Sequence, residues 1–160
     1  MRWRTKVDEA DCEAIRGLVA ATGFFSAEEV EIAVELVAET VAGGKESDYR
    51  FVVLDSDEQD GTITAYACYG RIPLTQASFD LYWIAVAPDA QRSGLGRETL
   101  QQAEAAAREE GATTMYVDTS GRDQYRPTRS FYERAGYSVA ARFTDFYAPG
   151  DDKIIYSKRL

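Results

Sequence analysis

The stretch QRSGLG at residues 91–96 lies between an apolar run and a long amphipathic segment, and its residue types suit phosphate binding. Where a strand ends in a glycine-containing turn and a helix begins, several main-chain N–H groups lack partners and point toward one spot. Its two glycines remove side chains that would block a close approach, and the helix dipole adds about half a positive charge there. Arg92 and Arg97 can add to this charge. Taken alone, the stretch fits either a phosphate site or a plain tight turn, and it is neither a Walker loop nor a GxGxxG motif.

The chain contains no histidine, which excludes the Ser-His-Asp and Cys-His nucleophilic arrangements and the commonest metal ligand. Any acid or base must therefore be Asp, Glu, Tyr, Lys, Cys or water. Cys12 and Cys68 form no CxxC pair, so we expect buried thiols rather than a disulfide or a metal site. The loop DSDEQDG at residues 55–61 resembles a calcium loop, but its ligands are misplaced and the twelfth position is Tyr66. We expect a solvated acidic turn there and no bound metal.

Length and charge limit the classes of protein that fit. A chain of 160 residues is long enough for one ordinary core and too short for two domains of usual size. No long apolar run occurs and the N-terminus lacks the pattern of a signal peptide, so we expect no membrane association and a cytoplasmic location. The formal charge of −9 argues against nucleic acid as a partner. The acidic balance either attracts cationic substrates or only keeps the protein soluble.

In the first half of the chain, periodicity predicts two helices between short strands. A strand near residues 3–7 leads into a helix that contains Ile15, Leu18 and Val19. The second helix begins at a capping box formed by Ser26 and Glu29 and ends at residues 43–44, which are both glycine. Residues 51–54 and 62–69 are expected to form an antiparallel hairpin that turns at Asp60-Gly61.

The second half begins with the apolar run at residues 80–86, which is typical of a central strand covered on both faces. A helix follows from Gly94 to Gly111, then a strand at residues 114–118 and a short helix at residues 128–135. Residues 137–147 and 153–158 are expected to form a terminal pair of strands. This alternation indicates an α/β or α+β sandwich with a mixed sheet.

The order of these motifs resembles the GNAT superfamily of acyl-CoA-dependent N-acetyltransferases. The apolar strand is followed by V-x-P, Q-x-x-G-x-G, an amphipathic helix, a strand and then FYERAGY at residues 131–137. The likeness covers nearly the whole chain, and its core is specific because two separate motifs occur in the right order. It implies one GNAT-like acetyltransferase domain over residues 1–160. It also implies a three-layer α/β (α+β) sandwich, with a mixed, mostly antiparallel sheet of about seven strands flanked by about four helices.

The resemblance further implies that an acetyl group moves from acetyl-CoA directly to a primary amine in a ternary complex. Tyr132 stands where the FYxxxGY motif of the family places the tyrosine that protonates the departing thiolate; a core aromatic is the alternative. Asp80 precedes Gln91 by eleven residues, a spacing at which some members carry a catalytic carboxylate, and apolar neighbours would raise its pKa. Other candidates for the base are Tyr82, Asp118 and an ordered water.

By the same resemblance, the loop at residues 91–96 would bind the pyrophosphate of acetyl-CoA, and the end of the preceding strand would pair with pantetheine. The residues expected to bind the cofactor are Ile84, Ala85, Val86, Gln91, Arg92, Ser93, Gly94, Leu95, Gly96, Arg97 and Tyr125. Many members have asparagine at the position of Tyr125, seven residues before the motif tyrosine. Here the ring and the arginines beside it either face the adenine, the ribose phosphate or the acceptor, or merely lead into the helix.

In this family the first two helices and the last hairpin usually frame the acceptor. The resemblance therefore points to residues 22–25, Tyr66, Tyr69 and the pair Phe146-Tyr147, with packing in the core as the alternative. The expected acceptor is a small-molecule amine, an amino acid or a peptide, and the expected assembly is a monomer or a homodimer. Two other functions fit the pattern: an acyl-CoA-binding sensor or scaffold without turnover, and a nucleotide-phosphate-binding protein unrelated to coenzyme A.

Overall fold

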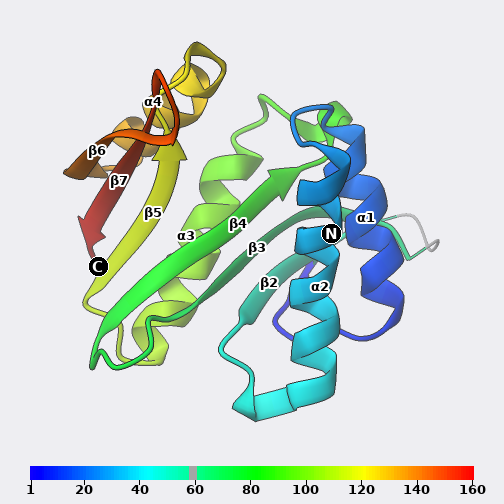
Figure 1. Ribbon diagram of the computed structural model, residues 1–160. Coiled ribbons are helices and arrows are strands. Elements are labelled where there is room, and N and C mark those ends of the chain that lie inside the picture. The colour runs from blue at the N-terminus through cyan, green and yellow to red at the C-terminus, as the bar shows by residue number, and fades with distance from the viewer. Residues whose placement is uncertain (58–60) are drawn as a thin grey trace.

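Seven strands in the described residues, 1–57 and 61–160, form one sheet in the computed structural model (Figure 1). The strands are β1 (Arg2–Arg4), β2 (Arg50–Asp55), β3 (Ile63–Arg71), β4 (Ser78–Val86), β5 (Thr114–Ser120), β6 (Ser138–Ala148) and β7 (Asp151–Arg159). The α-helices of the same residues are α1 (Ala10–Ala21), α2 (Ala27–Gly43), α3 (Leu95–Glu109) and α4 (Arg126–Arg134). Short 3-10 turns are η1 (Gly44–Glu46), η2 (Pro88–Ala90) and η3 (Asp123–Tyr125). The predicted Asp60-Gly61 turn and part of the acidic loop fall on residues 58–60, outside the described residues.

The strand order β1-β2-β3-β4-β5-β7-β6 puts β4 in the middle of the sheet. Every neighbouring pair is antiparallel except β4 and β5, which run parallel and pair only from Ser78↔Thr114 to Asp80↔Tyr116. Beyond Asp80 the two strands diverge, as Figure 1 shows. The mixed, mostly antiparallel sheet is confirmed, and the divergence leaves an edge of β4 unpaired in the centre of the molecule.

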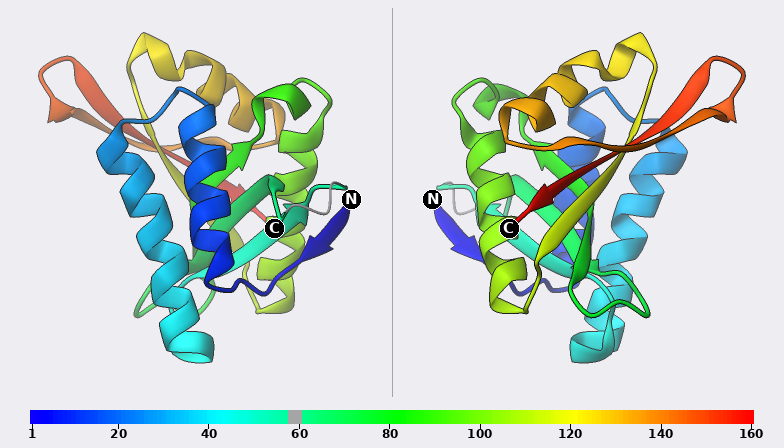
Figure 2. Two further views of the ribbon diagram at one scale, coloured as in Figure 1. Left: turned by 90° about the vertical axis from the view of Figure 1, so that its right-hand side faces the viewer. Right: turned by 90° about the vertical axis from the view of Figure 1, so that its left-hand side faces the viewer.

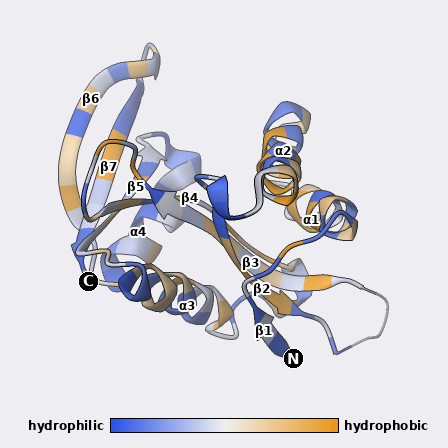
Figure 3. Ribbon diagram, turned by 90° about the horizontal axis from the view of Figure 1, so that it is seen from below, coloured by the Kyte–Doolittle hydropathy of each residue, from blue (hydrophilic) through white to orange (hydrophobic). Residues whose placement is uncertain are grey.

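Helices α1 and α2 cover one face of the sheet (Figure 3). Ser26 caps α2 as predicted: its hydroxyl accepts the Glu29 N–H at 3.2 Å, and the Glu29 carboxylate accepts the Ser26 N–H at 3.1 Å. This capping box fixes where α2 begins. The inward side chains of both helices, among them Ile15 and Val37, pack on β2, β3 and β4, where Phe51 of β2 belongs to the same cluster. The short connection between α1 and α2 is thereby held over the carboxyl end of β4.

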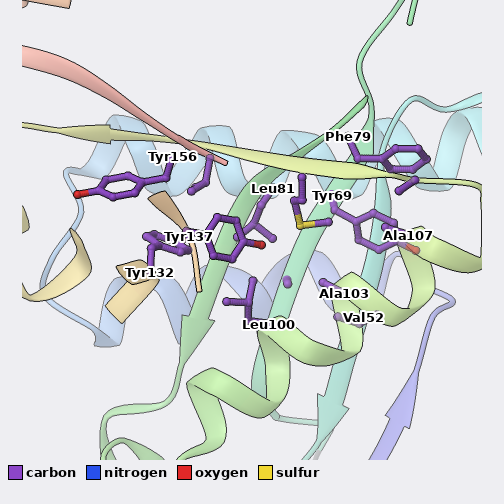
Figure 4. Packing of buried hydrophobic residues seen from close by; sticks show 14 of the residues in the cluster. Val52, Tyr69, Phe79, Leu81, Leu100, Ala103, Ala107, Tyr132, Tyr137 and Tyr156 are labelled. Atoms are coloured by element: carbon purple, nitrogen blue, oxygen red, sulfur yellow. The ribbon is translucent and has the colours of Figure 1, made fainter. Parts of the chain in front are cut away.

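Helices α3 and α4 cover the opposite face (Figure 3). The predicted apolar stripe of α3 is buried, with Leu100, Ala103 and Ala107 packed on Phe79 and Leu81 of β4. Figure 4 shows this cluster extending to three tyrosines, Tyr132 of α4, Tyr137 and Tyr156 of β7. The three-layer sandwich is therefore confirmed, and α4 is anchored through its motif tyrosine.

The terminal strands form the predicted antiparallel pair, and β7 rather than β6 pairs with β5. Strand β6 is the exposed edge, and Figure 2 shows the hairpin extending beyond the rest of the molecule. Near the turn, the pairing skips from Phe143↔Lys153 to Ala148↔Asp151, so several residues of β6 bulge outward. Asp145 has a φ of 54° in this bulge, its N–H is bonded to Asp152, and its carboxylate accepts the Gly150 N–H at 2.8 Å.

None of the helices in the described residues is both long and apolar enough to cross a membrane.

Candidate active site

A cavity of about 590 Å³, which we call the cleft, opens where β4 and β5 diverge. Its floor is the carboxyl half of β4. One wall comes from β5 and α4, and the other from the α1–α2 connection and the start of α2 (Figure 1). The residues that line it are Thr22, Phe24, Phe25, Glu29, residues 81–86, Gln91, Gly96, Val117, Asp118, Tyr125, Pro127, Thr128, Phe131 and Tyr132. The cleft thus collects side chains from segments far apart in the sequence.

The floor of the cleft offers main-chain hydrogen-bonding groups. Because β5 leaves β4 after Asp80, residues 84–86 pair with β3 on one side and with no strand on the other. A bulge lies just before them, since Trp83 pairs with Cys68 and Leu81 with Tyr69, which leaves Tyr82 as an extra residue. An unpaired strand edge can accept an extended ligand as a further strand.

The N-terminus of α3 lies at one end of the cleft. Gly94 precedes the helix with a φ of 87°, a conformation that favours glycine, and no side chain caps this end. The first hydrogen bond of the helix is donated by Glu98 to the Gly94 carbonyl at 3.1 Å, so residues 95–97 have no main-chain acceptor among the described residues. These N–H groups and the helix dipole favour an anion at this point. The Gln91 amide fixes the preceding loop by donating to the Val86 carbonyl at 3.1 Å.

A second cavity of about 400 Å³ adjoins the cleft, and we call it the arginine pocket. It shares Val86, Gln91, Gly96 and Phe131 with the cleft. The residues that line only the arginine pocket are Arg92, Gly94, Arg97, Arg134 and Ala135. Three arginines and no carboxylate in one pocket make a strongly cationic site, well suited to phosphate groups.

Tyr132 of α4 reaches the cleft from the core. The residue is only 3% exposed, and burial raises the pKa of its phenol well above the usual value, so it stays protonated. Its neighbours Tyr137 and Tyr156 donate to Glu104 at 3.0 Å and Glu133 at 2.9 Å, whereas the Tyr132 hydroxyl has no partner in the described chain. It is not among the fully enclosed unpaired atoms, which are the Tyr66 hydroxyl and the Trp83 indole nitrogen. The Tyr132 hydroxyl is therefore free to bond a molecule in the cleft.

Two carboxylates lie on the α1–α2 side of the sheet near the point of divergence. Asp118 lines the cleft and its Oδ2 pairs with Lys153 Nζ at 3.0 Å. Asp80 is half-buried behind the cleft rather than lining it. Burial, followed by the charge of Asp118, raises the pKa of Asp80 to about 6, against the opposing effect of Lys153. Asp80 is therefore largely ionised at neutral pH and close to the value that suits a base.

Aromatic rings form a continuous wall on the side of the α1–α2 connection. Tyr125 packs edge-on against Phe24 with 5.0 Å between the ring centroids, Phe24 against Phe25 at 5.0 Å, and Phe25 against Trp83 at 4.9 Å. The Arg122 guanidinium lies over the Tyr125 ring at 5.6 Å. Tyr125 thus joins two walls of the cleft, because it precedes α4 and touches the α1–α2 connection.

Most of the predicted cofactor residues line one or both cavities: Ile84, Ala85, Val86, Gln91, Arg92, Gly94, Gly96, Arg97 and Tyr125. Two do not. The Leu95 side chain is buried against Leu54 and Ala65, and the Ser93 hydroxyl donates to the Ala90 carbonyl at 2.7 Å. Neither side chain lines a cavity, so Ser93 and Leu95 can offer a ligand only their main-chain groups. Residues 22–25, expected near the acceptor, contribute three lining side chains. Tyr66 and Tyr69, expected there too, are 0% and 2% exposed in the core, because alternate β3 residues are covered by helices on both faces.

Sequence reasoning assigned no site role to Glu29 or Arg134. Glu29 was interpreted only as part of the capping box, yet it also lines the cleft. Arg134 lies one helical turn after Phe131, so both reach the arginine pocket from the same face of α4. That spacing was the available signal. Among the described residues, no group of three or more His, Cys, Asp or Glu side chains could hold a metal ion.

Comparisons with known proteins agree with this geometry. The model of the acetyltransferase (GNAT) family matches residues 20–137. A crystal structure of a protein from Desulfovibrio desulfuricans, assigned to the GNAT family, is similar to this chain at 44% sequence identity. Its TM-score is 0.93, and the match covers 99% of this chain and 98% of that one.

Two further solved structures share the fold at lower identity. The aminoglycoside 6'-N-acetyltransferase from Enterococcus faecium is 17% identical with a TM-score of 0.73, covering 99% of this chain and 97% of that one. A Salmonella typhimurium protein in complex with acetyl-CoA is 21% identical with a TM-score of 0.71, covering 100% of this chain and 94% of that one. No curated protein matches the sequence.

Proposed function

Because the chain belongs to the GNAT family of acetyltransferases, we propose that it transfers the acetyl group of acetyl-CoA directly to a primary amine. The observation that carries this proposal is Tyr132, a buried residue whose hydroxyl is unpaired within the described chain and which lines the same cleft as the open edge of β4. A donor molecule extended along that edge has its reacting end beside an acid.

The residues present fit acetyl-CoA as the donor. The main-chain N–H groups of residues 95–97 and the arginine pocket suit the diphosphate and the ribose phosphate, since both require dense positive charge. Residues 84–86 offer pantetheine an unpaired edge with alternating N–H and C=O groups. The cleft then continues toward the divergence of β4 and β5, where the thioester would meet the acceptor.

The acceptor amine must lose a proton before it attacks. At pH 7, neutralising an amine with a pKa near 10.4 costs about 4 to 5 kcal/mol. Asp80, with a pKa of about 6, is the proposed base. Because it does not line the cleft, an ordered water would carry the proton to it. Asp118 lines the cleft directly and is the alternative base, although Lys153 pairs with one of its oxygens.

Tyr132 acts when the thioester collapses. The amine nitrogen forms a bond to the carbonyl carbon, and the carbon–sulfur bond breaks with its electron pair going to sulfur. The Tyr132 phenol donates its proton to that sulfur, and the nitrogen releases one of its protons through water as the amide forms. The products are the N-acetyl amine and the free thiol, and the phenolate regains a proton from water, which balances the one that the nitrogen released. The acyl group is never bonded to the protein.

Incubation with acetyl-CoA and a panel of amines and peptides tests the proposal. We expect equal amounts of free thiol and N-acetyl product, quantified by a thiol reagent and by mass spectrometry. Binding of acetyl-CoA without N-acetyl product from any amine would instead identify a sensor or scaffold of this fold.

A further inference from the structure

The two cavities divide the charged side chains of the site by sign. Among the described residues, the arginine pocket contains Arg92, Arg97 and Arg134 and no carboxylate. The cleft contains Glu29 and Asp118 and no lysine or arginine. The phosphates of a donor belong in the arginine pocket, whereas the charges of the cleft favour an acceptor that is a cation.

The aromatic wall of the cleft also favours a positively charged acceptor. Four rings contact one another in a row, with 4.9 to 5.0 Å between neighbouring ring centroids, in the order Tyr125, Phe24, Phe25 and Trp83. Aromatic faces attract ammonium groups, and they give a hydrocarbon chain apolar surface to cover. The wall therefore suits both parts of an alkyl chain with a cationic end: the rings pack against the hydrocarbon and attract the ammonium.

The two carboxylates are not equivalent. Asp118 on β5 is partly neutralised by Lys153, which also lies over the Phe146 ring at 4.7 Å. Glu29 on α2 has no basic partner among the described residues, and only its Oε2 is used, by the Ser26 N–H. Its Oε1 is therefore available. Figure 1 places α2 and β5 on opposite sides of β4, so the uncompensated charge lies across the cleft from the wall that carries Tyr132.

The chemistry decides which charge Glu29 can use. The reacting nitrogen must become neutral before attack, so a monoamine gives up its only positive charge. A second ammonium at the far end of the acceptor keeps its charge throughout the reaction. A carboxylate at that end of the acceptor would meet Glu29 without any compensating cation in the lining.

We infer that the acceptor is a diamine or polyamine, with its reacting amine near Tyr132 and its second ammonium on Glu29 against the aromatic wall. The inference rests on the proposed function and narrows its acceptor to one class. It assigns Glu29 a role in specificity that is separate from its role in the capping box. Amino acids with a free carboxylate are excluded as good acceptors.

Three acceptors with five carbons each test the inference: cadaverine, whose far end is an ammonium, pentylamine, whose far end is a methyl, and δ-aminovalerate, whose far end is a carboxylate. We expect kcat/KM to fall in that order, by roughly tenfold between cadaverine and pentylamine, the usual effect of one charge-assisted contact. Equal values for cadaverine and pentylamine, or a preference for δ-aminovalerate, would overturn the inference while leaving amine acetylation intact. If none of the three is acetylated although another amine of the panel is, the inference fails and the proposed function stands; if no amine of the panel is acetylated although acetyl-CoA binds, the proposed function fails as well.

Glu29→Gln is the matching variant, because glutamine still accepts the Ser26 N–H in the capping box and only the charge is lost. Its ratio of kcat/KM for cadaverine over pentylamine should fall by roughly tenfold toward one. Glu28→Gln is the control, since Glu28 is an exposed neighbour on the same helical turn that does not line the cleft, and its ratio should stay at the wild-type value. An equal fall in both variants would mean that only net charge matters and would refute the assignment of Glu29.

Discussion

Four buried tyrosines, Tyr69, Tyr132, Tyr137 and Tyr156, lie in one cluster, and only Tyr132 has no hydrogen-bond partner in the described chain. Tyr137 and Tyr156 each donate to a glutamate, and their hydroxyls help tie α3 and α4 to the hairpin. The hydroxyl of a buried tyrosine usually has a hydrogen-bond partner, so the unpaired hydroxyl of Tyr132 distinguishes it from the other three tyrosines. Its position at the cleft accounts for this difference, since a ligand can supply the missing partner.

Tyr132→Phe should therefore lower kcat by roughly 100-fold or more, the usual contribution of a positioned acid. The affinity for acetyl-CoA should change little, because no binding group at α3 is lost. Steady-state kinetics and calorimetry measure the two effects separately. Tyr156→Phe is the control, since Tyr156 loses a bond to Glu133 but does not line the cleft. Wild-type turnover in Tyr132→Phe would remove Tyr132 from the mechanism.

Asp80 predicts the pH dependence of the reaction. Its pKa is raised to about 6, so the base form is lost as the pH falls through that value. In the wild type, kcat/KM should decline below about pH 6. Asp80→Asn should abolish this acidic limb and lower the rate at neutral pH. A profile with an unshifted limb and an undiminished rate would assign the base to Asp118 or to water.

The same shift has a consequence for stability. A carboxyl whose pKa is higher in the folded than in the unfolded protein stabilises the fold at low pH, and this stabilisation is lost as the pH rises from about 4 through about 6. At pH 7, Asp80→Asn should consequently have a free energy of unfolding about 1 kcal/mol higher than the wild type, after allowance for the partial exposure of Asp80. Denaturant titration measures this difference. The difference should shrink at pH 4. A less stable variant at pH 7 would show that Asp80 is a structural partner instead.

At the scale of the elements, the start of α3 is the part of the molecule on which donor binding depends most. A Cβ at Gly96 would lie 3.5 Å from the Phe131 ring, an ordinary contact, so the protein itself does not require glycine there. The residue nevertheless lines both cavities at the uncapped end of the helix. The absence of a side chain is then best explained by a ligand that approaches the main chain closely.

Gly96→Ala should leave the fold intact and weaken coenzyme A binding by roughly tenfold or more, because a methyl group would stand where the diphosphate meets the N–H groups. Gly17→Ala is a matched control in the exposed face of α1, where an added Cβ meets nothing within 4 Å. It should raise the unfolding free energy by up to about 1 kcal/mol and leave affinity unchanged. Calorimetric titration and thermal unfolding of both variants check the pair. Wild-type affinity in Gly96→Ala would contradict the proposed position of the diphosphate.

The elements themselves were largely readable from the sequence. The capping box at Ser26, the apolar stripe of α3 and the turn residues around the hairpins act locally, so their effects appear in a short stretch of chain. The insertion of β7 between β5 and β6 was not readable, because it depends on pairing between distant strands. Nor was the bulge of β6, which is held by the positive φ of Asp145 and its bonds to Asp152 and Gly150.

At the scale of the whole molecule, the sheet is weakest in its middle. Strands β4 and β5 pair only from residue 78 to residue 80 on β4 and then separate, so the part built from β5, β6, β7 and α4 is joined to the rest by a short ladder and by helix packing. A donor molecule across the divergence would contact both parts. It would thus add a connection that the unbound protein lacks.

Acetyl-CoA should consequently raise the melting temperature. A ligand at 100 times its Kd adds about 2.7 kcal/mol to the stability of the folded state, which for a protein of this size corresponds to roughly 5 to 10 °C. Differential scanning calorimetry over a series of ligand concentrations measures the shift. ATP at the same concentrations should produce a smaller shift, because it lacks the pantetheine arm. An equal shift with ATP would favour a general nucleotide-phosphate site.

The cleft was only partly predictable because it is assembled at this largest scale. The motif residues Gln91, Gly96 and Tyr132 could be found from their spacing. Glu29 could not, because its own segment indicates only a capping box. Arg134 shares a face of α4 with Phe131, but that spacing does not tell which cavity the face meets. Such residues reach a cavity only because the helices pack on the two faces of the sheet in this arrangement.

Hydrogen–deuterium exchange with and without acetyl-CoA tests the central claim most directly, since it reports where the donor contacts the main chain. The account predicts slower exchange at two separate segments, residues 84–86 on the open edge of β4 and residues 91–97 at the start of α3. Tight binding with unchanged exchange at both segments would contradict it, because the donor would then lie elsewhere on the protein.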